Sequence, residues 1–175
     1  MQPTHTSPSL QSVAPANPDN PGCLLGRCLH SGREALLREW LDRVIKDPAI
    51  PTDSLSPEQV GVHFPGFIHE LTDTLMNARS HGERGDHGGD GFQYGAARWK
   101  QGFLLAEMLR ELTHLRCIVI ERVVRFEGGD GGLGTMEMLL VTDTVHRFVD
   151  RMGIAAITHF LTQGVHEREM VTAAA

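Results

Sequence analysis

The chain has 175 residues, of which 41% are hydrophobic and 22% are charged, proportions typical of a single globular domain. Its net charge of -6 gives it no general positive field, so we expect neither nucleic acid nor a membrane as a partner. The sequence contains no apolar run near the roughly 20 residues that cross a bilayer, and its start does not resemble a secretory signal. We therefore expect a cytoplasmic protein.

The first 22 residues contain five prolines and one charged side chain among Ser, Asn and Gln. Such a composition cannot bury enough apolar surface to offset the entropy lost on ordering. We expect residues 1–22 to form a disordered tail. Residues 23–175 are then a single helical domain.

Two capping patterns predict helices in the first half of the domain. Ser31 and Glu34 have the spacing of a capping box, and apolar residues follow at helical intervals up to Pro48. Ser56 and Gln59 repeat the same spacing and predict the start of a second helix. We therefore expect one helix to begin at each serine.

A proline interrupts this second helix. Because Pro65 has no backbone N–H, it must kink or restart the helix, after which one apolar face continues to Met76. Residues 80–91 follow, with five glycines among charged side chains, and are expected to form a mobile loop.

Two long helices are predicted in the second half. Apolar residues spaced three or four apart from Phe92 to Phe126 predict a third helix, with Phe103 and Leu109 in the core. Glycines at 128–134 end it, and Thr135 caps a fourth helix that reaches the end of the chain. Four amphipathic segments without strand-like alternation predict an all-α protein, an antiparallel four-helix bundle with long third and fourth helices. A globin-like helical packing is the alternative.

Two pairs of residues resemble half of a carboxylate-bridged metal site. Glu111 with His114, and Asp143 with His146, each place a carboxylate and an imidazole one helical turn apart. The remainder of a ligand set has no distinctive pattern, so we expect no metal and no cofactor, with metal or haem binding kept as the alternative. We find no serine elbow and no cysteine with an adjacent base, and we expect no catalytic activity.

Three charged residues lie among apolar neighbours in the predicted third helix: Arg98, Glu111 and Arg116. A charge in such a setting must be paired or must reach solvent. The three side chains either form a network that sets the helix register or extend to the surface along their aliphatic stems. The sequence leaves both arrangements open.

An ordered series of short motifs along residues 31–170 resembles the amino-terminal domain of RsbRD-type RsbT co-antagonists. The series consists of Trp40, Phe64-Pro65-Gly66-Phe67-Ile68, Leu71-Thr72-Asp73-Thr74-Leu75, Arg98-Trp99-Lys100-Gln101-Gly102-Phe103, Glu111 and Leu115-Arg116. Members of that family often carry a histidine four residues before the arginine that matches Arg98, and at that position this chain has Tyr94.

The resemblance implies a helical sensor or regulatory domain of bacterial stress signalling, of a type also found ahead of sensor histidine kinases. Tyr94, Arg98, Glu111 and Arg116 are then candidates for a regulatory or structural network. The leading hypothesis is a signal-input module whose last helix relays a change to a downstream signalling domain or partner protein. A metal- or haem-binding bundle and a passive scaffold are the alternatives.

Surplus apolar residues on the last two predicted helices indicate a parallel homodimer. A monomeric bundle buries one stripe of each helix, and several large apolar residues lie off that stripe. They are Leu104, Leu105, Met108 and Ile118 on the third helix, and Leu139 and Ile154 on the fourth. We expect these residues to form the partner surface.

Overall fold

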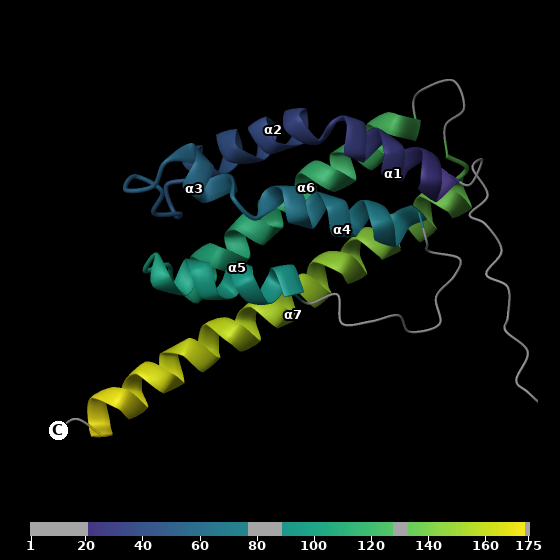
Figure 1. Cartoon of the computed structure of the whole chain (residues 1–175). Coiled ribbons are helices and arrows are strands. Elements are labelled where there is room, and N and C mark those ends of the chain that lie inside the picture. Colours follow the sequence, from purple (N-terminus) through teal and green to yellow (C-terminus); the bar gives the residue numbers. More distant parts are fainter. Residues whose placement is uncertain (1–20, 77–88, 128–132, 174–175) are drawn as a thin grey trace, which may run out of the picture.

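The computed structural model describes residues 21–76, 89–127 and 133–173, and every regular element within them is a helix. The predicted all-α class is therefore confirmed. The predicted tail falls outside the described residues up to residue 20, as does the predicted loop from 80 to 88. The seven helices, shown in Figure 1, are α1 (Pro21–Ser31), α2 (Arg33–Lys46), α3 (Pro57–Gly61), α4 (Phe64–Met76), α5 (Gly89–Lys100), α6 (Leu105–Glu127) and α7 (Thr135–Ala173).

Helix α1 was not expected, and it begins two residues inside the predicted tail. Leu25 and Leu29 are buried in the core, and α1 packs on α4. The predicted capping box at Ser31 is wrong, because its hydroxyl donates to the carbonyls of Arg27 and Cys28 in the last turn of α1. Helix α2 begins after Gly32, which offers no side-chain cap.

The second capping pattern is confirmed. The Ser56 hydroxyl accepts the Gln59 N–H at 3.3 Å, and the Gln59 side chain accepts the Ser56 N–H at 2.8 Å. Helix α3 nevertheless ends at Gly61, and α4 restarts with Pro65 in its first turn, where the missing N–H costs nothing. The apolar face expected after Pro65 is buried.

The predicted continuous third helix is wrong, because the chain breaks at Gly102. This glycine has φ +79°, and it donates to the Trp99 carbonyl while Phe103 donates to that of Arg98. These two bonds form a Schellman motif, which ends α5. The apolar spacing continues across the break, which is why periodicity alone did not reveal it, and Phe103 is buried as predicted.

The core face of α6 agrees with the predicted spacing at Leu112, Leu115, Val119 and Val123, which are buried, but it differs at three other positions. Leu109 is 36% exposed, whereas Met108 and Ile118 are fully buried, so the assignments of all three are wrong. The break at Gly102 restarts the helix and shifts its angular phase relative to α5. The stripe predicted for the last helix is correct, with Val141, Val145, Phe148, Met152 and Ala155 buried.

Helices α5 and α6 both pack on α7, but they run in opposite directions relative to it. Gly91 lies against Met152 and Gly95 against Ala156, so α5 runs parallel to α7. Arg116 pairs with Asp150, and Leu112 lies beside Gly153, so α6 runs antiparallel to it. The antiparallel four-helix bundle is therefore not confirmed.

Helix α7 starts at Thr135 itself, since the preceding Gly134 carbonyl accepts the first helical bond and Thr135 is not the cap. Its 39 residues correspond to about 58 Å at 1.5 Å per residue. The carboxyl-terminal end of α7 extends past the other helices (Figure 1).

Candidate functional site

A fully buried ion pair lies where α5 meets α6. Arg98 and Glu111 are each 0% exposed, and Arg98 Nε donates to Glu111 Oε2 at 2.7 Å. Removing both charges from water is costly, and only close pairing with further hydrogen bonds offsets that cost. The sequence left open whether these charged side chains pair or extend to the surface. In the structure, Arg98 and Glu111 pair with each other in the core.

The other groups of Arg98 are also satisfied. Its Nη2 donates to the Val60 carbonyl and its Nη1 to Gln101 Oε1, both at 2.7 Å. The guanidinium carbon lies 5.2 Å from the ring centre of Tyr94 and 4.9 Å from that of Phe103. A planar cation between aromatic rings is a favourable arrangement. Arg98 therefore joins α3, α5 and the turn before α6.

Two further residues donate hydrogen bonds to Glu111. The Tyr94 hydroxyl, on α5, donates to Glu111 Oε2 at 2.5 Å, and the Trp40 indole N–H, on α2, donates to the Glu111 carbonyl at 3.2 Å. Glu111 Oε1 is buried and has no hydrogen-bond partner among the described residues. One helix position on α6 is thus tied to both α2 and α5.

Burial controls the ionisation of this network. It raises the pKa of Glu111, while the positive charge of Arg98 and the hydrogen bond from Tyr94 act in the opposite direction. Burial and the nearby Glu111 carboxylate raise the pKa of Tyr94 well above its ordinary value. Tyr94 therefore keeps its proton and remains a hydrogen-bond donor to Glu111.

His63 lies next to the network, and the sequence did not single it out as a site residue. Its ring stacks on Phe67, with centres 6.3 Å apart, and meets the Tyr94 ring edge-on at 5.8 Å. Burial, with a further contribution from Arg98, lowers the pKa of His63 and favours the neutral imidazole. His63 Nε2 has no hydrogen-bond partner in the described part of the chain.

Arg116, the fourth predicted network residue, lies elsewhere. It pairs with Asp150 of α7 at 2.5 Å, near the protein surface. Five residues separate it from Glu111, which turns its side chain by about 140° around a helix of 3.6 residues per turn. The structure therefore brings together Tyr94, Arg98 and Glu111, but not Arg116.

The residues of the alternative metal site are also separated. Glu111 is inside the network, while His114 Nε2 lies 2.7 Å from Asp47 Oδ2, which also accepts from Arg110. Hydrogen bonds from Arg110 and His114 hold the pKa of Asp47 well below its usual range.

On α7, Asp143 pairs with Arg147 at 2.8 Å and His146 is exposed. Within the described ranges, no three His, Cys, Asp or Glu side chains are grouped as metal ligands would be.

Comparison with known proteins identifies a family. Residues 34–169 match the family described as the RsbT co-antagonist protein rsbRD N-terminal domain, and this span includes every residue of the network. No curated protein and no solved structure matches the chain. None of the helices in the described ranges combines the length and the apolar character that a membrane span requires.

Proposed function

Because the chain belongs to the RsbT co-antagonist rsbRD N-terminal domain family, a family of stress-signalling regulatory domains, we propose that it is a non-catalytic cytoplasmic signal-input domain. In this proposal a ligand or partner shifts the packing of the helices, and α7 relays the change to a downstream signalling domain or partner protein. The setting is bacterial stress signalling or a two-component relay.

The observation that carries this proposal is the buried network. Through Arg98 and Glu111 it connects α2, α3, α5 and α6, and α5 then lies directly on α7 through Gly91 and Gly95. Buried ion pairs add less to stability than apolar packing does, but they favour one arrangement of the elements that they join. A displacement of α5 would therefore change both the network and the packing of α5 against α7.

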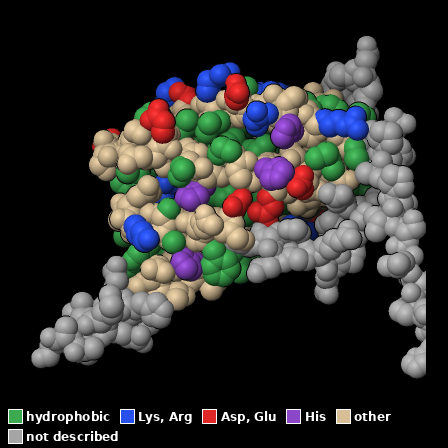
Figure 2. All heavy atoms as spheres, viewed as in Figure 1, with side chains coloured by type: hydrophobic (Ala, Val, Ile, Leu, Met, Phe, Trp, Pro, Cys, Tyr) green, Lys and Arg blue, Asp and Glu red, His purple; other side chains and the backbone are tan. Residues whose placement is uncertain are grey.

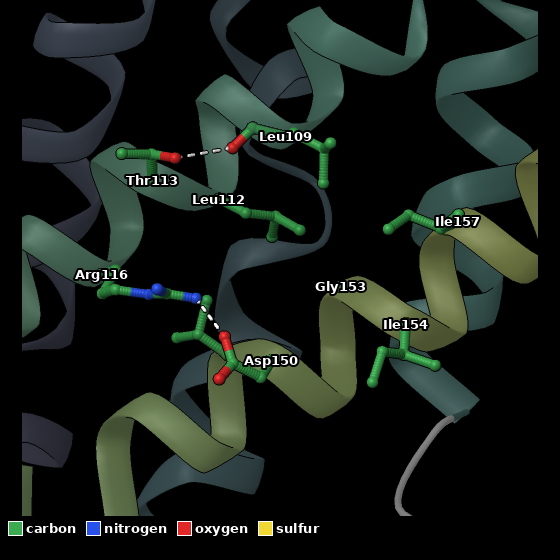
Figure 3. A pocket seen from close by; sticks show the side chains of 9 residues that line it. Leu109, Leu112, Thr113, Arg116, Asp150, Gly153, Ile154 and Ile157 are labelled. Carbon is green, nitrogen blue, oxygen red and sulfur yellow. Dashed lines mark hydrogen bonds and ion pairs between the residues drawn. The ribbon is translucent and has the colours of Figure 1, made fainter. Parts of the chain in front are cut away.

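We further propose that the domain acts as a parallel homodimer through a surface on α6 and α7. A groove of about 420 Å³ lies between these helices (Figure 3). Leu109, Ile154 and Ile157 flank it, and Ile154 is 65% exposed. Leu161, two turns beyond Ile154 on α7, is 53% exposed. Exposed apolar residues at helical spacing are typical of a helix-packing interface.

The charges at this groove suit a second copy of the same chain. Arg116 and Asp150 face each other across it (Figure 3), so each copy presents both signs of charge at one place. A two-fold interface must be self-complementary, and a patch that carries both signs meets this requirement. Of the residues first assigned to this surface, Leu104, Leu139 and Ile154 are exposed, whereas Met108 and Ile118 are not.

Light scattering of the purified chain at micromolar concentration tests the association. We expect a dimeric mass, and we expect Ile154→Glu to give a monomer because it places a charge in the apolar surface. Ile45→Glu is the matched control, since Ile45 is a 47% exposed isoleucine on α2, away from the groove. A monomeric wild-type chain, or equal effects of both substitutions, would contradict the proposed interface.

Spin labels test the geometry of the relay. In a variant whose exposed Cys28 and Cys117 are replaced by serine, one label at the exposed Thr162 reports the separation of the two α7 helices in the dimer. A parallel dimer gives a short distance that Arg98→Met changes. If the labels lie at opposite ends of the dimer, or if the distance is the same with and without the Arg98→Met substitution, the proposed relay is wrong.

A stress-response reporter tests the biological setting. In the native host, deletion of the gene should change the amplitude of the response, and the wild-type gene should restore it. The Arg98→Met gene should restore it less well, provided that blotting shows equal amounts of the two proteins. An unchanged response in the deletion strain would contradict the role in stress signalling.

A further inference from the structure

Two acidic side chains lie on α4 and α5 near the place where these helices approach α7, outside the buried network. Glu70 of α4 is half-buried, and Asp90 lies in the first turn of α5. The Asp90 carboxylate is seated against Gly66, one turn before Glu70: its Cγ is 3.0 Å from the place where a Cβ of Gly66 would lie. Figure 2 shows acidic side chains and histidines together on the face formed by α4 and α5.

The charged groups around Glu70 come from three helices. The negative charge of Asp90, on α5, raises the pKa of Glu70, and the positive charge of Arg151, on α7, lowers it. On α4 itself, His69 pairs with Asp73 on the exposed side. His63, which immediately precedes α4, is also influenced by the charge of Asp90. Helices α1 and α2 also pack on α4, but none of their described ionisable groups contributes to the Glu70 environment.

This arrangement favours the protonated form of Glu70. Burial is the largest cause, and the negative charge of Asp90 adds to it, while Arg151 acts in the opposite direction. The pKa of Glu70 is thereby raised from 4.5 to about 7. Glu70 therefore changes its charge in the range of cellular pH.

We propose that Glu70 and Asp90 form a proton-responsive contact between α4 and α5. With a proton on Glu70, its carboxyl group can lie against the Asp90 carboxylate without charge repulsion. Loss of the proton leaves two like charges at the junction and weakens the contact. Proton concentration is then a stimulus that this domain senses.

The structure also provides a route from this contact to α7. Asp90 immediately precedes Gly91, which lies 2.9 Å from the Met152 carbonyl when measured from its ideal Cβ position. Tyr94, one turn further along α5, belongs to the buried network. A change at the α4–α5 contact therefore acts on the helix that joins the network to α7. This last step rests on the relay proposed above, whereas the proton uptake does not.

Carbon-detected NMR titration of the full chain between pH 4 and 9 tests the proton site. We expect the Glu70 carboxyl signal to titrate with a midpoint near 7. Asp90→Asn should lower that midpoint, and Arg151→Gln should raise it, because the two charges act in opposite directions. Glu34→Gln, which removes an exposed carboxylate on α2, is the matched control and should leave it unchanged. The proposal would be overturned by a wild-type midpoint near 4.5, or by a midpoint that neither Asp90→Asn nor Arg151→Gln shifts.

Thermal unfolding provides a second readout with a defined sign. A carboxyl group whose pKa is raised in the folded state stabilises the fold fully below its unfolded pKa, here 4.5, and this contribution is lost as the pH rises through about 7. The Tm of the wild-type chain should therefore fall relative to that of Glu70→Gln between pH 5 and pH 8. Parallel Tm curves for the two proteins would overturn the proposal.

Amide hydrogen exchange separates the sensor from the relay. In the wild-type chain, protection factors of amides 91–95 should decrease between pH 5.5 and pH 8, and in Glu70→Gln they should not. If the titration succeeds and these amides respond but the label distance at residue 162 does not, the proton site stands and the proposed relay fails. If the amides do not respond, the contact between α4 and α5 is not governed by the proton, and the present inference fails.

Discussion

At the residue scale, the buried pair of Arg98 and Glu111 makes the sharpest prediction. Arg98→Met leaves the Glu111 carboxylate without its cation in the core, and Glu111→Leu leaves the guanidinium without its anion. Each single substitution should lower the free energy of unfolding by about 3–5 kcal/mol. The double substitution should cost less than the two single costs combined, since it leaves neither charge unpaired. Urea denaturation of the four proteins measures these differences.

Arg116→Met is the matched control for this cycle. Arg116 and Asp150 also form an ion pair between helices, but their side chains are 35% and 60% exposed. A surface pair contributes about 1 kcal/mol or less, so the control should be close to wild type. Equal costs for Arg98→Met and Arg116→Met would mean that the network does not constrain the fold.

At the scale of the elements, the close approach of α5 to α7 depends on the absence of a side chain. A Cβ on Gly95 would collide with the backbone carbonyl of Ala156, which cannot turn aside as a side chain can. Gly95→Ala should therefore destabilise the protein by about 1–3 kcal/mol, although alanine is the better helix former. Thermal and urea denaturation report the loss.

Gly89→Ala provides the comparison on the same helix. A Cβ at Gly89 meets nothing within 4 Å, so this variant should be as stable as wild type or slightly more stable. A stable Gly95→Ala protein would show that α5 can move away from α7 at little cost. The contact would then be a poor route for a signal.

At the scale of the whole molecule, the folding unit is larger than the span that matches the family. That span begins at residue 34, yet Leu25 and Leu29 of α1 are at most 1% exposed and complete the core against α4. A fragment of residues 34–175 should lose at least about 4 kcal/mol relative to a fragment of residues 21–175, as expected when two buried leucines are removed. This difference corresponds to a fall in Tm of roughly 10 °C, measurable by calorimetry. Equal Tm values would show that α1 is not part of the folding unit.

Local sequence patterns were sufficient to predict the helical class and several features of the fold. Ser56 and Gln59 cap a helix as their spacing predicted, Pro65 restarts one, and the apolar stripe of α7 is buried. Each of these features depends on residues within one or two turns, so a local pattern is sufficient to predict it. The motif series around Arg98 and Glu111 also indicated the family.

Other features depend on contacts between helices and could not be predicted from local patterns. The left-handed turn at Gly102 divides an apolar pattern that continues through it, and this division exposes Leu109 in place of Met108. Arg98 and Glu111 were named from the sequence, but their pairing required α5 and α6 to meet across that turn, while Arg116 of the same set faces α7. Helical periodicity specifies which residues share a face, but the relative rotation of two helices is set by the turn between them and by the packing of the whole core.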